Sequence, residues 1–135
     1  MTVDERTLLS MPESDYMNAE QLAFFRRCLE DQRDDLLNNF TQTTRHLQKT
    51  ESKPDPVDRA TQEEEYAIEL RTRDRERKLL HKIEIAIQRI NRGEYGYSEE
   101  TGEPIGLKRL LARPTATLTV EEQERHELLE RQFGS

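Results

Sequence analysis

Apolar residues recur at helical spacing along two long stretches of the chain, residues 18–50 and 56–93. Steps of three, four and seven residues place each set on one face of a helix. The first set comprises Leu22, Phe25, Leu29, Leu36, Phe40 and Leu47. The second set comprises Val57, Ala60, Ala67, Leu70, Leu80, Ile83, Ile87 and Ile90. The pattern predicts two helices of matched length, each roughly 50 Å long.

A turn rich in proline separates the two stripes. It reads Lys53-Pro-Asp-Pro-Val-Asp-Arg-Ala60, and each proline disfavours helix at the residue before it. The first helix should therefore stop by about residue 52. Asp55 suits the cap of the second helix and Pro56 its first position. Two matched helices and a short turn predict an antiparallel coiled-coil hairpin over residues 18–93, with its tip at 53–60.

Helix signals also mark the start of the hairpin. Asn18 followed by Gln21 is typical of a capping box. Asn91-Arg-Gly93 should end the second helix. Residues 1–17 form an N-terminal segment whose apolar cluster around Leu8 either pins it to the globule or leaves it disordered.

After residue 93 the pattern changes to short elements. Tyr95 and Tyr97 alternate before a Thr101-Gly102 turn, which predicts a small β-hairpin or knuckle. One or two turns of helix should follow over Leu107–Leu111. Residues 94–135 are therefore expected to form a small globular region.

A last helix should close this region. Thr119 and Glu122 form a second capping box at its start. Its apolar residues are Leu128, Leu129 and Phe133, and we expect them to pack against the base of the hairpin. The fold class predicted is mainly α.

Composition supports an elongated helical protein. Only 33% of the 135 residues are hydrophobic and 36% are charged, too little apolar material for a large core. The net charge of −7 argues against direct sequence-specific DNA binding and favours a protein partner. Cys28 is the single cysteine, no apolar run could span a bilayer, and the first residues lack a secretion signal. A cytoplasmic monomer without membrane contact is expected.

A basic run, residues 71–78, lies in the second helix. In a hairpin turning near residue 54 it faces the acidic run of residues 30–35. Two interpretations stay open. The runs form a charge-matched middle that specifies register, or the basic run presents a face to a partner.

Catalysis by the chain itself is not indicated. His46, His81 and His126 lack the surroundings of a metal or nucleophile motif, and the acidic runs lack the spacing of a calcium loop. For Asp55 and Asp58, helix capping is a sufficient explanation. A hydrolytic metal pair there is disfavoured because a tip has no pocket that excludes water. The sequence predicts neither catalytic residues nor a metal site.

Several sequence stretches occur together in one known family. They are Asp55-Pro-Val-Asp-Arg-Ala60, Gln62-Glu-Glu-Glu65, Glu69-Leu-Arg71, Arg73-Asp-Arg-Glu-Arg-Lys-Leu79, Tyr95-Gly-Tyr97 and Arg109-Leu-(x)-Ala-Arg-Pro-Thr115. From about Tyr16 onward the chain resembles the DksA family of bacterial transcription regulators. The resemblance implies a factor that binds RNA polymerase through the secondary channel, directs its tip toward the active site and modulates initiation with ppGpp in the stringent response. The alternative is a coiled-coil adaptor for a different protein.

The resemblance also implies particular site residues. Asp55, Asp58 and Ala60 match the family's tip residues. The family's ppGpp site, shared with polymerase, is matched by Leu79, Lys82 and Arg113, and two cations beside an apolar residue suit a guanosine polyphosphate. A further basic position of that site is Gln123 here, a departure from the family pattern. No cofactor is expected to be bound tightly.

The largest departure from the family concerns zinc. Zinc-binding members carry two pairs of cysteines, and those positions are Ser98, Thr101, Thr119 and Glu122 here. Neutral hydroxyls are poor zinc ligands, and one carboxylate does not hold the ion alone. The chain therefore resembles the cysteine-poor members, and we expect a degenerate zinc-finger-like knuckle without zinc.

Overall fold

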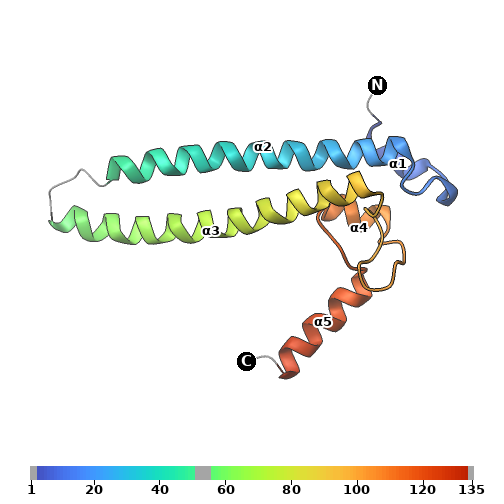
Figure 1. Ribbon diagram of the computed structural model, residues 1–135. Helices are drawn as coiled ribbons and strands as arrows, with labels where there is room; N and C mark the ends of the chain where they lie inside the picture. The colour runs from blue at the N-terminus through green and yellow to red at the C-terminus, as the bar shows by residue number, and fades with distance from the viewer. Residues whose placement is uncertain (1–2, 51–55, 134–135) are drawn as a thin grey trace. The chain divides into compact units, whose positions relative to one another are not determined.

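The protein, analysed as a computed structural model, is mainly helical, as the sequence predicts (Figure 1). Its backbone is described for residues 3–50 and 56–133, and its side chains for the same residues except 43–50 and 56–58. The elements are α1 (Glu5–Ser10), the 3-10 turn η1 (Glu13–Asp15), α2 (Ala19–Thr50), α3 (Pro56–Arg92), α4 (Leu107–Ala112) and α5 (Val120–Phe133). Among the described residues, no helix is both long and apolar enough to cross a membrane.

The two long helices begin and end close to the predicted positions. Asn18 Oδ1 accepts the N–H of Gln21 at 2.9 Å, and Gln21 Oε1 accepts the N–H of Met17 at 2.8 Å, so a reciprocal cap starts α2. The other long helix, α3, starts at Pro56, where a missing N–H is tolerated. It ends before Gly93, whose φ of +77° is the left-handed conformation typical of a helix stop.

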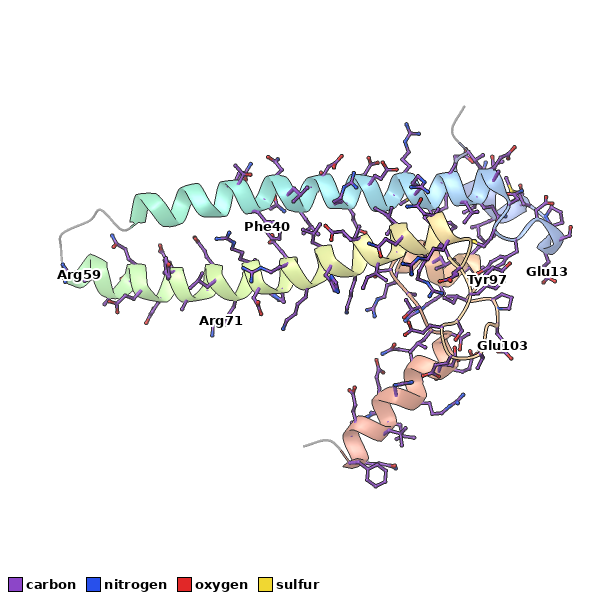
Figure 2. The ribbon with its side chains drawn as sticks, in the orientation of Figure 1. Glu13, Phe40, Arg59, Arg71, Tyr97 and Glu103 are labelled. Atoms are coloured by element: carbon purple, nitrogen blue, oxygen red, sulfur yellow. The ribbon has the colours of Figure 1, made fainter. Side chains whose placement is uncertain are left out.

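The chain divides into two compact units, residues 1–30 with 85–135, and residues 31–84. In the second unit the later part of α2 and the first part of α3 run antiparallel, side by side (Figure 1). Phe40 points from α2 toward α3, and Arg71 lies on the outer side of α3 (Figure 2). The second unit is therefore a helical hairpin.

The stripe of α3 that turns inward differs from the one predicted. Its members follow at seven-residue steps, from the half-buried Gln62, Glu69 and Glu76 to the buried Ile83 and Ile90. A seven-residue repeat is the period of a coiled-coil seam. The prediction holds for Ile83 and Ile90. The seam positions in the first half of α3, Gln62 and Glu69, are polar instead.

The described residues in the first half of the predicted α3 stripe are not buried. Ala60, Ala67 and Leu70 are exposed, and the side chain of Val57 lies outside the described residues. The reason is geometric. Ala60 and Ala67 are themselves seven residues apart, but each lies two residues before a seam position, Gln62 or Glu69, which is about 200° around the helix.

Ion pairs do not join the two helices at the middle of the hairpin. The acidic residues 31–35 and the basic run 71–78 are all described, and no ion pair forms between them. Their contacts are local, Arg33 with Asp34 at 3.6 Å and Asp74 with Lys78 at 3.4 Å. The predicted charge-matched middle is therefore wrong as a set of cross-helix pairs.

The first unit holds most of the apolar core. Its fully buried side chains include Leu8, Phe25, Leu29 and Leu110. Burial of Leu8 shows that the N-terminal segment is pinned to the globule, one of the two alternatives left open by the sequence. Phe25 also packs against Tyr95, with ring centroids 5.6 Å apart. The Tyr95 hydroxyl donates to the Pro114 carbonyl at 2.8 Å, which satisfies its one buried polar group.

Tyr16 ties the N-terminal segment to the loop that precedes α4. Its hydroxyl donates to the Gly96 carbonyl at 2.6 Å and accepts the Gly106 N–H at 2.9 Å. Its ring meets Tyr97 edge-on, 5.5 Å between centroids. Gly96 must be glycine here, because its φ is +92° and an added Cβ would lie 2.6 Å from the sulfur of Met17.

Candidate functional site

Residues 95–106 form a knuckle held by few backbone contacts. Among the described residues, a single antiparallel bridge joins Tyr97 and Pro104. The Ser98 N–H donates to the Glu103 carbonyl at 2.8 Å, and the Gly102 N–H returns to the Ser98 carbonyl at 2.9 Å. Of the two alternatives predicted, the structure has the knuckle, and within the described residues the β-hairpin does not extend beyond one bridge.

Three of the four residues that the resemblance aligns with zinc ligands lie together at this knuckle. Ser98, Thr119 and Glu122 are all buried, and Glu122 is only 3% exposed. Glu122 Oε2 accepts the Ser98 hydroxyl at 2.9 Å, and Oε1 accepts the Thr119 N–H at 2.8 Å. Thr119 Oγ1 accepts the Glu122 N–H in return at 3.2 Å, which confirms the predicted capping box of α5.

The fourth position, Thr101, is exposed at the edge of this cluster. Its N–H and that of Glu100 donate to Ser98 Oγ, at 3.2 and 3.1 Å. The Ser98 hydroxyl therefore accepts hydrogen bonds from the loop backbone and donates one to Glu122 of α5. We name Ser98, Thr119 and Glu122 the carboxylate knot, because one carboxylate joins two segments 24 residues apart in sequence.

Hydrogen bonds stabilise the charged form of this carboxylate. The Thr119 N–H contributes most, the hydroxyls of Ser98, Thr119 and Thr101 add to it, and burial opposes them, so the pKa of Glu122 falls from 4.5 to about 2. Glu122 is thus ionised at neutral pH. The carboxylate knot carries a fixed negative charge at the start of α5, where the helix dipole favours it.

The predicted tip residues lie mostly beyond what the structure describes. Asp55 falls outside the described residues. Asp58 is helical in α3, but its side chain is not described. Ala60 is exposed, four residues into α3. Their role at the tip stays a prediction.

The predicted ppGpp residues fall in separate units. Leu79 is half-buried and Lys82 exposed, one helical turn apart on α3 in the second unit. Arg113 is exposed directly after α4 in the first unit, and its N–H donates to the Arg109 carbonyl at 2.8 Å. Gln123 lies on α5, where its amide donates to Glu127 at 3.3 Å. Whether Leu79, Lys82 and Arg113 form one site stays a prediction.

The apolar residues of α5 do not pack as predicted. Leu128 and Leu129 are about half exposed and Phe133 is 83% exposed. The helix is instead held at its beginning, by the carboxylate knot and by a contact between His126 and Glu100 of the knuckle. These polar contacts attach the amino-terminal half of α5 to the knuckle. The position of α5 therefore does not depend on burial of its carboxyl-terminal half.

Sequence analysis missed two features of the first unit. Tyr16 was not expected to bridge Gly96 and Gly106, because both partners are backbone atoms more than 75 residues away. Arg89 was also missed. Its guanidinium donates to the carbonyls of Glu94 and Tyr97, at 3.1 and 2.8 Å. The only available signal was an arginine in the last turn of a helix, where it can reach free carbonyls.

The fold and the site define a helical-hairpin protein with a zinc-finger-like knuckle closed by a carboxylate. Residues 21–90 match the N-terminal domain of the DnaK suppressor protein DksA, and residues 93–128 match the prokaryotic dksA/traR C4-type zinc finger.

Individual relatives agree with this classification. The RNA polymerase-binding transcription factor DksA of Caulobacter vibrioides (strain NA1000 / CB15N) is 55% identical over 86% of this chain and 82% of its own length. Its namesake from Escherichia coli (strain K12) is 48% identical over 91% of this chain and 82% of its own. The structure of transcription factor DksA2 from Pseudomonas aeruginosa aligns with a TM-score of 0.87 at 46% identity, covering 95% of this chain and 99% of that one. The chain belongs to the DksA family.

The zinc ion implied by the family's finger does not fit these residues. The four positions offer three neutral hydroxyls and one carboxylate, a donor set that zinc does not favour. Both oxygens of Glu122 already accept hydrogen bonds within the protein. Among the side chains that the structure describes, no three His, Cys, Asp or Glu gather as a metal site.

Proposed function

We propose that this protein regulates transcription by binding bacterial RNA polymerase through the secondary channel, with the hairpin tip near the polymerase active site. The observation that carries the proposal is the 48 to 55% identity, over most of the chain, to proteins named RNA polymerase-binding transcription factors. At such identity the fold and main binding mode are ordinarily retained, while function still rests on particular residues.

Surface properties support a protein partner. In the hairpin unit α3 leaves three large apolar side chains exposed, Tyr66 at 36%, Ile68 at 55% and Leu70 at 41%. Tyr66 and Leu70, four residues apart, share one face of the helix, and neighbouring exposed apolar residues are typical of an interaction surface. The basic run 71–78 follows directly, with Arg71 on the outer side of α3 (Figure 2). Lys78 pairs with Asp74 within the helix, so we propose that the exposed arginines of the run, Arg71, Arg75 and Arg77, contact the partner.

Asp55 and Asp58 are proposed to act at the tip without reacting themselves. A carboxylate delivered to the polymerase active site changes the local charge and biases mobile elements. We further propose that ppGpp enhances this effect through Leu79, Lys82 and Arg113. Gln123 supplies no charge at the remaining family position, so the coupling should be weaker than in members with a cation there.

A purified initiation assay tests the tip. Asp58→Asn should abolish the effect on initiation while polymerase affinity stays nearly unchanged, because the hairpin docks along its length and acts at its end. Asparagine keeps a side-chain oxygen that can cap a helix, so this change removes the charge at little cost in stability. If Asp58→Asn lowers only the melting temperature and regulation survives, the proposed role of the tip is wrong. Failure of the parent protein to co-purify with polymerase would favour the adaptor alternative.

The same assay with and without ppGpp tests the nucleotide site. Lys82→Ala or Arg113→Ala should weaken the ppGpp response and spare the effect of the factor alone. Loss of a charge-assisted contact costs about 1.5–3 kcal/mol, or roughly ten- to a hundredfold in affinity. Arg92→Ala is a matched control, because Arg92 is exposed on the same helix and lies outside the basic run. Equal ppGpp stimulation of the variants and the parent would remove this site from the proposal.

A further inference from the structure

A cleft of about 750 Å³ lies in the first unit, and none of the predicted tip, ppGpp or zinc-finger positions line it. Its walls come from the α1–η1 segment, the loop that precedes α4, and α4 itself. The lining includes Leu9, Met11, Tyr16, Ile105, Arg109 and Val120. Clefts of roughly 300–1,000 Å³ are the usual size for small-molecule sites.

Most of the cleft lining is apolar, and several of its polar groups already have hydrogen-bond partners within the protein. The Tyr16 hydroxyl is fully used by Gly96 and Gly106. Gln21 is buried, with Oε1 accepting from Met17 and Nε2 directed at the Met11 sulfur, 3.4 Å away. Leu9 and Val120 leave about two fifths of their surface exposed, at 43% and 41%. An occupant would meet an apolar wall here, with no donor or acceptor to satisfy.

The lining also carries positive charge. Arg109 Nε is buried and has no hydrogen-bond partner in the described part of the chain. Lys108 next to it is exposed, and Glu13 is the one acid in the lining. Two cations to one acid make a locally basic site in a protein whose net charge is −7. A buried N–H without an acceptor destabilises the protein unless a ligand or water fills the place.

We propose that this cleft binds a small amphipathic carboxylate, a molecule with an apolar body and one anionic head. The carboxylate would accept from Arg109, whose planar guanidinium matches it, and Lys108 would add charge. The apolar body would cover Leu9, Val120 and their neighbours and displace water from them. A second charge on the ligand is disfavoured by Glu13. The proposal does not depend on polymerase binding.

Octanoate is a suitable probe. Octanol is its neutral counterpart, and inorganic phosphate is an anion that lacks an apolar part. Binding is measured by displacement of anilinonaphthalene sulfonate from the full-length protein, and independently by the rise in melting temperature. The parent should bind octanoate saturably, octanol about tenfold or more weakly, and phosphate not at all under the same conditions.

Variants then locate the site. Arg109→Met keeps the length and apolar stem of the side chain and should weaken octanoate about tenfold or more, with octanol unchanged. Leu9→Gln, at a partly exposed position, should weaken both probes severalfold. Arg125→Met is the charge-matched control on the exposed surface of α5. Phe133→Ser removes the most exposed apolar side chain of that helix, and neither control should change octanoate binding.

Three results would overturn the proposal. Octanoate that fails to displace the dye, an Arg109→Met protein that binds it like the parent, or binding lost with Phe133→Ser would each show that the cleft is not the site. Because Arg109→Met alone could disturb α4, its circular dichroism must match the parent, and Leu9→Gln provides the second test. None of these results bears on the transcription assay, so the two proposals fail separately.

Discussion

At the residue scale, we propose that Glu122 takes over part of the structural role that zinc has in the family's four-cysteine finger. Zinc links segments through up to four bonds, whereas Glu122 links α5 to the knuckle through two accepted hydrogen bonds. Bonds to an ionised acceptor are stronger than neutral ones. On this proposal, the stability of the knuckle depends on the ionisation state of Glu122.

The pH dependence of folding follows from the lowered pKa of Glu122. A group whose pKa falls from 4.5 when unfolded to about 2 when folded stabilises the protein above pH 4.5, and loses that contribution as the pH falls toward 2. Urea unfolding between pH 7 and pH 2.5 should show this decline. Glu122→Gln should be less stable at pH 7 and lose less on acidification. Glu121→Gln, exposed in the same helical turn, should follow the parent curve; equal curves for all three proteins would contradict the assignment.

Tyr16 is a second residue whose role lies in its hydroxyl. Tyr16→Phe keeps the edge-on contact with Tyr97 and removes both hydrogen bonds, leaving a carbonyl and an N–H unpaired. We expect a loss of about 1–3 kcal/mol in the free energy of unfolding. Chemical denaturation measures it, with helix content unchanged at neutral pH. Tyr66→Phe, at an exposed position, is the control, and an equally small loss in both variants would show that the bridge contributes little.

At the element scale, the hairpin changes character along α3. Apolar seam residues lie where α3 approaches residue 90, and polar ones lie toward its start. Polar residues at a coiled-coil seam specify register at a cost in stability. The start of α3 should therefore open more readily than its end, since local stability follows the density of buried apolar contacts.

Gln62 offers a direct test of the polar seam. Its Nε2 is buried without a hydrogen-bond partner in the described structure, so Gln62→Leu should remove that penalty and add apolar contact. We expect a gain of about 1 kcal/mol, seen as slower amide hydrogen exchange in the first half of α3. Gln32→Leu, exposed on α2, is the matched control. Faster exchange in Gln62→Leu would mean that the amide has a structural role after all.

At the scale of the whole molecule, we propose that folding is independent of zinc. In members with four cysteine ligands the metal contributes folding energy, so chelation should unfold their finger. In this chain the carboxylate knot and the buried Tyr95, Ile105 and Leu110 lie in the region that matches the family's zinc finger, residues 93–128. Of the packing residues available nearby, Tyr97, Leu107 and Leu118 are only half-buried.

Metal removal should consequently leave the protein folded and active. Exhaustive chelation, or oxidation that destroys thiol ligands, should not change circular dichroism or transcriptional regulation. A four-cysteine relative treated in the same way is the positive control and should lose its globule. Elemental analysis that finds near one zinc per chain would contradict the prediction, as would collapse of the helical signal on chelation.

The sequence alone determined α2, α3, α4 and α5, because the signals concerned are local, but it did not predict α1 or η1. Pro56, Gly93, the Asn18–Gln21 cap and the Thr119–Glu122 box each act within about four residues, and the structure has all of the helices they predict. The family could also be inferred from the sequence, since its motifs are contiguous stretches.

Tertiary structure decided which side chains those elements bury and which distant atoms they join. The polar seam at Gln62 and Glu76, the exposure of Phe133, and the absence of cross-helix ion pairs between the acidic and basic runs depend on where two helices meet, which periodicity does not specify. The bonds from Tyr16 to Gly96 and from Ser98 to Glu122 join segments 80 and 24 residues apart. Every residue carries a backbone carbonyl, so the sequence does not indicate which one accepts a hydrogen bond from Tyr16. Only the folded structure identifies it as that of Gly96.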